Sequence, residues 1–428
     1  MTIRFAHLAD PHLGAFRDPV LRRLNLEAFV KALRVAGDAG VDFVVIAGDL
    51  FDSPLPDMNV VHEASDALWQ LRTSGARVYV FHGSHDRSPL ESGIMDVLAA
   101  TRLFELVDAS GPGEDGVTPV PVRDGPTGAV IAAVGGMRGG LEREALGRLD
   151  ATVLMEAIED APLAIFGYHG SVEGMLPEEL AMVETVPVKK LPQGFHYLAL
   201  GHVHHHMEMT LEGGGLAAYP GPTFGATFTD LADHRPKGLL IVEAKEDGIC
   251  DTEFVPIEAA PVALVDLDAG GRSGTAAREE LMKMVEAEGW EAKVVLLRAH
   301  GTLAEGRPAE IGIPAARDVI LDRGAIAVYV SRAGLRGAED RRTGEKSDGK
   351  GTEEPGSVSK RVLSRAIDGF DTSQQWLTGE EGKALADDLL TVLKQERGTR
   401  KVDDHKETIL RNGMAVLDPT RHDRGEEP

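Results

Sequence analysis

Aspartate and histidine side chains stand at the ends of five apolar runs that have the length of β-strands. A single aspartate in such a place is more typical of a turn, and a single histidine is more typical of a hydrogen-bonded polar residue. One set after each of five runs is hard to explain by turns, and instead indicates a shared site. Both residue types are ligands for divalent metal ions. The candidate ligands are Asp10, His12, Asp49, His169, His202 and His204, with His85 beside them.

The spacing of these residues favours a centre with two metal ions. Asp10 and His12 are two residues apart, as are His202 and His204, so each pair points to one side of an extended chain. Carboxylates and imidazoles that converge without a cation would repel one another or change protonation. Mixed histidine and carboxylate ligands suit Mn, Fe or Zn better than Ca. A central carboxylate such as Asp49 can bridge two ions, an arrangement used in phosphoester hydrolysis.

These ligands need elements that bring five strand ends together. Residues 1–255 alternate strand-length apolar runs with amphipathic stretches, which predicts an α/β layered domain. Ligands bind at the carboxyl ends of strands in such domains. The predicted strands lie within 3–10, 41–49, 76–86, 163–171 and 195–205, and the clearest predicted helices lie within 25–40 and 59–75.

The pattern changes after residue 255. Residues 256–336 predict a small α/β module, and residues 337–357 are rich in charge, Gly and Ser, which predicts a flexible linker. Residues 358–398 contain two amphipathic stretches that are too short to build a core alone, so they pack on the main body or on a partner. We favour the partner, because a flexible linker suits delivery to another chain. Residues 399–428 are expected to form a polar tail.

Composition limits where the protein acts and what it binds. The chain of 428 residues carries a net charge of −24. Any binding of nucleic acid must therefore come from local groups of basic residues and from bound metal. Its one cysteine, Cys250, cannot form an internal disulfide, and no apolar run reaches the roughly 18 residues of a membrane span. Residues 1–10 lack the features of a signal peptide, which favours the cytoplasm.

Five short motifs together resemble those of the calcineurin-like metallophosphoesterases: "DPH", "GDLFD", "GSHD", "YHGS" and "GHVH". The resemblance covers residues 1 to about 225. The stretches "VDFVVIAGDLFDSPLP" and "FHYLALGHVH" are more narrowly similar to the SbcD and meiotic-recombination-eleven nucleases of DNA double-strand-break repair. This resemblance implies a layered β-sandwich flanked by helices, a capping domain that contacts DNA, and a helical segment that binds an SbcC-like coiled-coil ATPase. It also implies a nucleoid-associated homodimer formed by helices near 24–36 and 59–72, although those faces can equally pack on the core.

The same resemblance implies roles for the individual residues. Asp10, His12, Asp49 and His204 would hold one ion, while Asp49, His169 and His202 would hold the other, with Mn as the expected metal. His85 matches the family histidine that stabilises the transition state and protonates the leaving oxygen. Asp52 and Asp86 are expected to orient the ligands. The implied reaction is phosphodiester hydrolysis.

Ser84 departs from the family pattern, which has an asparagine ligand at this position. A serine side chain is shorter and is a weaker neutral ligand, so we expect it to reach the second ion only through water. Two outcomes remain open at this stage. Either the second site binds its metal more weakly, which we favour because His85 and the other ligands are retained, or the protein has lost much of its activity.

Three functions are therefore in competition. The first is a Mn-dependent nuclease subunit that degrades DNA ends by exonuclease action, with single-strand endonuclease action also possible. The second is another calcineurin-like phosphoesterase, against which the additional module and the helical segment argue. The third is a weakly catalytic scaffold for DNA and the ATPase, which Ser84 keeps open.

Overall fold

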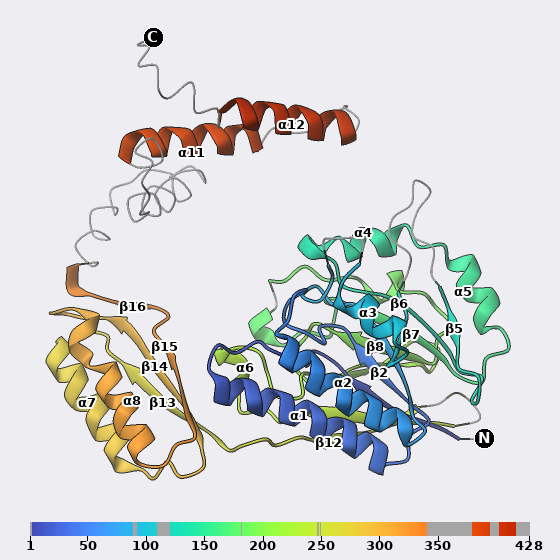
Figure 1. Ribbon diagram of the computed structural model, residues 1–428, viewed down its shortest axis with the longest axis horizontal. Coiled ribbons are helices and arrows are strands. Elements are labelled where there is room, and N and C mark those ends of the chain that lie inside the picture. Colours follow the sequence, from blue (N-terminus) through green and yellow to red (C-terminus); the bar gives the residue numbers. More distant parts are fainter. Residues whose placement is uncertain are drawn as a thin grey trace. The chain divides into compact units, whose positions relative to one another are not determined.

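The computed structural model describes residues 2–88, 92–108, 120–180, 182–245, 248, 250–339, 379–393 and 402–416. The chain divides into two units, Met1–Arg341 and Arg342–Pro428. The first unit contains a β-sandwich domain and a small module after it (Figure 1). Among the described helices, none is both long and apolar enough to cross a membrane.

The first sheet of the sandwich carries the strands that precede three of the predicted ligand sets. Strands β1 to β4 run parallel, and β11 and β12 extend the sheet antiparallel beyond β1. The order across the sheet is β12 (Cys250–Pro256), β11 (Gly238–Ala244), β1 (Ile3–Leu8), β2 (Phe43–Ala47), β3 (Arg77–Phe81) and β4 (Glu105–Leu106).

The second sheet carries the strands that precede the other two ligand sets. Strands β6, β7, β8 and β10 run parallel, with antiparallel strands at both edges. The order is β5 (Val122–Arg123), β6 (Val130–Val134), β7 (Ala164–His169), β8 (Tyr197–Gly201), β10 (Leu216–Tyr219) and β9 (Met207–Thr210).

The two sheets pack face to face through an apolar core. Successive side chains of a strand point to opposite faces. Phe5 and Phe43 therefore stack between the sheets, with ring centroids 5.2 Å apart. Neighbouring Ala6 faces the helices instead. His7 also points inward, and its Nδ1 lies 2.9 Å from the Tyr197 hydroxyl of the second sheet.

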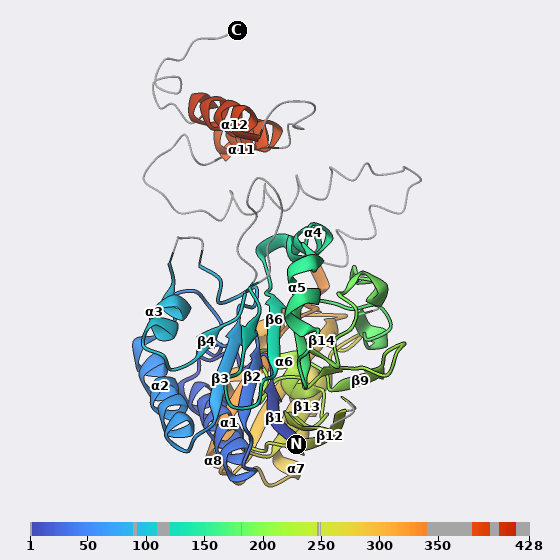
Figure 2. The ribbon, with the colours of Figure 1, turned by 90° about the vertical axis from the view of Figure 1, so that its right-hand side faces the viewer.

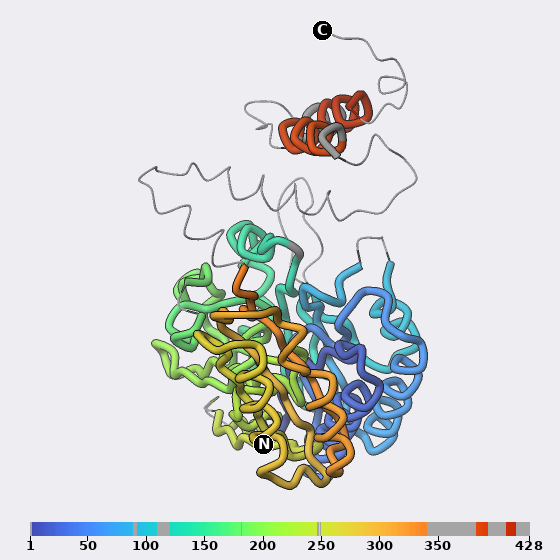
Figure 3. Tube along the Cα trace, turned by 90° about the vertical axis from the view of Figure 1, so that its left-hand side faces the viewer, coloured from blue at the N-terminus to red at the C-terminus, as the bar shows by residue number. Residues whose placement is uncertain are grey.

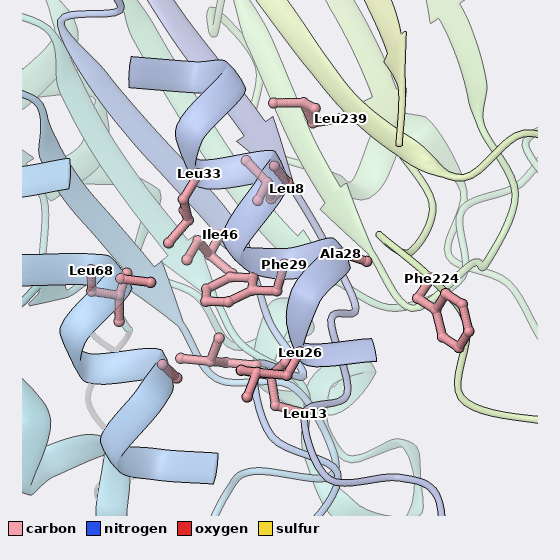
Figure 4. Packing of buried hydrophobic residues seen from close by; sticks show 14 of the residues in the cluster. Leu8, Leu13, Leu26, Ala28, Phe29, Leu33, Ile46, Leu68, Phe224 and Leu239 are labelled. Atoms are coloured by element: carbon pink, nitrogen blue, oxygen red, sulfur yellow. The ribbon is translucent and has the colours of Figure 1, made fainter. Parts of the chain in front are cut away.

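Helices cover both outer faces of the sandwich (Figure 2). Helix α1 (Pro19–Asp38) begins at a proline after the N-cap Asp18, and α2 (Met58–Thr73) begins after the N-cap Asp57. Figure 4 shows Phe29 and Leu33 of α1 against Ile46 of the sheet. The first sheet is also covered by α3 (Ile94–Ala100), and the second by α4 (Glu142–Gly147) and α5 (Ala151–Ile158).

Residues 262–336, which we call the capping module, form a βαβ-type layer, shown in yellow and orange in Figure 3. Its strands β13, β14 and β15 are parallel, and one face of the sheet packs on the module's own helices. Val294, Leu296 and Ala327 on the other face join the apolar cluster of α1 and the first sheet. The elements are β13 (Val262–Asp268), α7 (Gly274–Ala287), β14 (Val294–Thr302), α8 (Ile313–Asp322), β15 (Ala327–Ser331) and β16 (Leu335–Arg336).

The predicted layered fold is confirmed, but the sequence left several elements unnamed. All five predicted strands are present as β1, β2, β3, β7 and β8. Strands such as β6 and β13 were not named, because neither ends in a candidate ligand and Asp266 interrupts the apolar run of β13. The short helices are α6 (Phe228–Ala232), η1 (Arg138–Gly140), η2 (Glu178–Leu180), η3 (Val188–Lys190) and η4 (Pro308–Ile311).

The second unit contains two described helices, α11 (Gly379–Leu393) and α12 (Val402–Val416), which contact each other. Helix α11 falls within the predicted helical segment and buries Leu385 and Val392. The amphipathic stretch at 358–370 and most of the expected linker lie outside the described residues. Helix α12 lies in the expected polar tail, where Ile409, Leu410 and Met414 supply a short apolar repeat that the sequence analysis did not weigh.

Candidate metal centre

The predicted ligands lie at one edge of the sandwich. Asp10 and His12 follow β1, Asp49 follows β2, and His85 follows β3 of the first sheet. His169 ends β7 of the second sheet, and His202 and His204 follow β8. The close packing of β2 on β7 and β8 brings the two sets of strand ends together.

Two groups of potential metal ligands share Asp10, and all of their members except the half-buried His204 are buried. One group contains Asp10, His12 and His204, and the other contains Asp10, Asp49 and His169, with the ligand atoms of each group within 4.8 Å of one another. The His12 and His204 Nε2 atoms are 3.2 Å apart. The Asp49 Oδ2 atom lies 3.5 Å from His12 Nε2 and 3.3 Å from His169 Nε2. Asp49 therefore stands between the histidines of the two sheets.

A third group joins His12, Asp52 and His85 at the solvent side. His12 Nδ1 lies 3.1 Å from Asp52 Oδ1, so Asp52 orients this ring and leaves Nε2 toward the other ligands. The His85 backbone N–H donates to Asp49 Oδ1 at 2.8 Å, and its ring Nδ1 donates to the Asp52 carbonyl at 3.1 Å. The His85 side chain is 49% exposed, which makes it accessible to a substrate.

His202 and His169 differ in their electrostatic surroundings. His202 remains exposed at the mouth of the site, yet desolvation of its ring, reinforced by the nearby His169, lowers the pKa of His202 to about 4. Its backbone N–H donates to both Asp10 carboxylate oxygens at 3.0 Å. Burial opposes charge on His169 as well, but the carboxylates of Asp49 and Asp10 raise the pKa of His169 to about 10. Without a cation, this buried imidazole must carry the compensating positive charge.

The donor set fits divalent metal ions. His169 Nδ1 donates to the Ala47 carbonyl at 2.9 Å, whereas its buried Nε2 has no hydrogen-bond partner. A polar atom that is buried without a partner is costly unless something ligates it. Burial raises the pKa of Asp10, which is the expected response of a carboxylate beside another carboxylate and no cation. A bound cation removes both penalties.

The backbone of the site is strained in the way expected of a functional centre. Among the described residues, six that are not glycine have positive φ, and four of them belong to this site: Asp10 at 51°, His12 at 45°, Asp49 at 48° and His202 at 93°. Such conformations cost about 1–3 kcal/mol each and persist where the surroundings impose them. Gly83 is also required, since a Cβ there would lie 1.9 Å from Asp49 Oδ1.

The turn after β3 is fixed to the end of β2 through a buried carboxylate. Asp86 accepts hydrogen bonds from the Gly83 and Leu50 N–H groups, both at 2.8 Å. Burial, together with the nearby Asp49 carboxylate, raises the pKa of Asp86 to about 6. Ser84 is half-buried in the same turn, between Gly83 and His85. The turn therefore has a defined position relative to Asp49.

Asp230 was not among the residues predicted from the sequence. Its Oδ1 lies 3.0 Å from His204 Nδ1, while its Oδ2 accepts from the Ala226 and Thr227 N–H groups, both at 2.9 Å. This carboxylate is thus held on one side and orients His204 on the other. The sequence feature that could have indicated Asp230 is the capping box of α6, in which Thr227 and Asp230 cap the helix reciprocally. Nothing in the sequence indicated that His204 lies beside it.

A β-sandwich between helices that collects aspartates and histidines at its strand ends defines a metallophosphoesterase, and residues 3–206 match the calcineurin-like phosphoesterase model. Over these residues the chain is similar to the calcineurin-like phosphoesterases, and it resembles their SbcD and Mre11 branch.

Two relatives show the extent of this likeness, and both are DNA double-strand break repair proteins named Mre11. The protein from Methanopyrus kandleri is 28% identical over 68% of this chain and 64% of its own length. The protein from Thermoplasma acidophilum is 24% identical over 70% of this chain and 77% of its own length. This chain spans about half to just under two thirds of the length of three Mre11 relatives, among them the Methanopyrus kandleri protein.

A solved dimetal phosphatase from Danio rerio is also similar. It has a TM-score of 0.36 and 14% identity, and the match covers 60% of this chain and 99% of that chain.

Proposed function

We propose that the protein is a two-metal phosphodiesterase, most active with Mn²⁺, that hydrolyses DNA ends. The observation that carries this proposal is the buried group of Asp10, Asp49 and His169, in which His169 Nε2 makes no hydrogen bond and lies 3.3 Å from Asp49 Oδ2. A site with this donor set suits divalent transition ions. The relatives that are named as DNA double-strand break repair proteins support DNA as the substrate.

In this proposal the ligands divide between two ions. Asp10, His12, Asp49 and His204 would hold one, and Asp49, His169 and His202 would hold the other, so Asp49 would be shared by both. The position of Asp49 Oδ2 between His12 and His169 supports the bridging role. When bound, the ions neutralise charge on the phosphate and activate water for attack on phosphorus.

Side chains of the protein orient the proposed metal ligands and donate a proton to the substrate. Asp52 and Asp230 hold the Nδ1 sides of His12 and His204, so their Nε2 atoms stay directed at the centre. The His85 Nδ1–H group donates to the Asp52 carbonyl, which leaves Nε2 available to the substrate. Protonated at Nε2, His85 donates that proton to the leaving oxygen of the cleaved ester.

The proposal extends to partners. An SbcC-like coiled-coil ATPase would bind the helical segment at about 358–398, and the amphipathic α11 within it supports this assignment. A homodimer would form through α1 and α2, and the complex would act on DNA at the nucleoid, in the cytoplasm. Exposed Leu55 and Met58 at the start of α2 are consistent with a contact there.

The test uses the purified full chain with Mn²⁺ on linear duplex and single-stranded DNA. We expect metal-dependent release of nucleotides, and His85→Ala should lower the rate by about 10²- to 10⁴-fold, the usual contribution of a general acid. Metal affinity, measured by calorimetry, should not change. His206→Ala is the matched control, because His206 pairs with Glu208 at 2.8 Å and stacks on Phe254 outside the centre.

Other outcomes identify the competing functions. Equal rates for the parent and His85→Ala would remove the proposed proton donor. DNA binding without hydrolysis at saturating Mn²⁺ would identify a scaffold, which Ser84 keeps open. Hydrolysis confined to small phosphoesters would identify a different phosphoesterase.

A further inference from the structure

A second pocket lies at the end of the first sheet that is opposite to the metal centre. Arg77 begins β3, whereas the turn with His85 follows the other end of this strand. The pocket has a volume of about 510 Å³, within the range of pockets that hold small molecules. It lies between the ends of α2 and α3 and the edge strand β4, which contacts α3 and β3 (Figure 2). Its charged lining residues are Arg72, Arg77, Arg102 and Glu105, and the others are Val78, Tyr79, Ala99, Phe104 and Leu106.

Three arginines and one glutamate give this pocket a positive balance, although the whole chain carries a net charge of −24. A pocket on α1 and α2 shows the contrast, because its three cationic residues accompany three acidic ones: Arg23, Lys31, Arg34, Glu27, Asp38 and Glu63. Arg23 there pairs with both Glu27 and Glu63. The lining of the pocket beside β4 has no such compensation, so it attracts an anion from solution.

The guanidinium of Arg77 is held in a fixed orientation. Its Nε and Nη2 atoms donate to the two carboxylate oxygens of Asp124, with the Nη2 bond 3.0 Å long. Asp124 is fully buried, and it also accepts from the Tyr79 hydroxyl at 2.6 Å and from the Thr127 N–H at 3.0 Å. The Arg77 side chain is still 31% exposed, so it remains accessible from the pocket. A guanidinium that is already oriented can bind an anion at a lower cost in entropy.

Arg72 and Arg102 carry the positive charges that are not compensated. Arg72 lies in the last turn of α2, and Arg102 follows Thr101, the C-cap of α3. Both are exposed, and neither forms an ion pair with another described residue. Arg102 also has a φ of 62°, at a position after a helix where glycine or asparagine is usual. An arginine that is retained in a strained conformation points to a use for its side chain beyond ending the helix.

We propose that this pocket binds the phosphate group of a small molecule. Arg72, Arg77 and Arg102 bind the phosphate oxygens, because guanidinium groups match phosphate in charge and in the geometry of their donors. A free phosphate ion fills only a small part of the pocket, and the half-buried Ala99 and Leu106 offer an apolar surface to the rest of a larger ligand. The site lies at the opposite end of β3 from the metal centre, so this inference does not depend on the proposed nuclease function.

The test measures binding to the purified full chain in EDTA, so that no phosphate binds through metal ions. Calorimetry compares deoxyadenosine 5′-monophosphate, inorganic phosphate and the uncharged deoxyadenosine. We expect both phosphates to bind and the nucleoside not to bind. The double variant Arg72→Gln with Arg102→Gln should weaken binding about tenfold or more, because it removes charge-assisted hydrogen bonds to the phosphate. Arg77 stays unchanged, because the buried Asp124 needs its charge.

Glu105→Gln should have an effect of the opposite sign, which a folding defect would not produce. It removes the one negative charge of the lining, so phosphate should bind a few-fold more tightly. The matched control is Arg34→Gln with Arg317→Gln, which removes two exposed arginines outside the pocket. Its affinity should stay within about twofold of the parent, because distant exposed charges are screened.

The possible results also identify the source of the phosphate. Tighter binding of the nucleotide than of inorganic phosphate supports a phosphorylated small molecule as the ligand, and equal affinity supports the free ion at the same arginines. Failure of both phosphates to bind, binding that survives the loss of Arg72 and Arg102, or an equal loss in the control variant would overturn the site.

Discussion

Two histidine–aspartate clusters lie at strand ends of the sandwich, one on turns of the first sheet and the other where strands of both sheets end, and they differ in how completely their polar atoms are paired. In the closed cluster, Asp108 accepts from His82 Nδ1 and from Arg87 Nη2, the latter at 3.1 Å. Arg87 also donates to the Gly136 carbonyl at 3.0 Å. In the open cluster, the metal centre, His169 Nε2 has no hydrogen-bond partner and two carboxylates are buried close together.

The completeness of this pairing distinguishes a cluster that stabilises the fold from a set of residues that bind metal. Burial opposes the charge of His82, yet Asp108 raises the pKa of His82, so this pair stabilises itself as an ion pair. In the open cluster, charge compensation from the protein's own residues requires protonation of His169. A buried cluster that is incomplete in this way is the one expected to bind a cation.

The largest effect is expected from Asp49→Asn. The substitution removes the carboxylate that stands between His12 and His169, and with it the proposed bridge between the two ions. The hydrolysis rate with Mn²⁺ should fall by about a thousandfold or more, since metal ions supply several kcal/mol of transition-state stabilisation. Calorimetry should also find fewer bound ions. A variant that retains both activity and two bound ions would contradict the bridging role.

The complementary substitution in the closed cluster is Asp108→Asn. It leaves a buried histidine and arginine without their anion, and breaking such a pair costs about 3 kcal/mol of folding free energy. Denaturant unfolding should detect this loss, while Mn²⁺ affinity stays within about twofold of the parent, because Asp108 has no contact with the ligands. If metal affinity fell and stability did not, the distinction between the two clusters would be invalid.

The sequence revealed the open cluster because its members follow a local rule. Each of Asp10, Asp49, His169 and His202 stands directly at or after an apolar run, and the strand ends meet in space. The roles assigned to these residues remain predictions. The left-handed backbone at His12 and Asp49 could not be foreseen, because positive φ is uncommon outside glycine, even though Asp and His adopt it more often than most residues.

The residues that reach the site from distant parts of the chain could not be predicted from the sequence by this rule. His204 and Asp230 are 26 positions apart, and Arg298 reaches the pocket of the metal centre from a separate module. Only tertiary packing brings these residues together, and no periodicity encodes it. Strands β6 and β13 could not be predicted in this way either, because no candidate metal ligand follows their apolar runs.

Asp230→Asn tests whether such a distant partner contributes to metal binding. The amide loses the charge that holds the Nδ1–H side of His204, and changes of this kind typically weaken metal affinity about 10- to 100-fold. Calorimetry with Mn²⁺ should detect the loss. Asp233→Asn is the matched control, because Asp233 pairs with His205 Nε2 at 3.1 Å and His205 is not a proposed ligand. Equal losses in both variants would point to a general change of charge.

The smallest effect is expected from Ser84→Asn, which restores the family's amide ligand on a turn that Asp86 already holds in place. The longer side chain would bring a carbonyl oxygen toward the ion that Asp49, His169 and His202 are proposed to hold. The second Mn²⁺ should therefore bind a few-fold more tightly, while the first is unchanged. Two-site calorimetry of the parent and the variant separates the two affinities. Identical affinities would show that Ser84 does not limit the second site, and the open cluster would then be complete without the residue that differs from the family pattern.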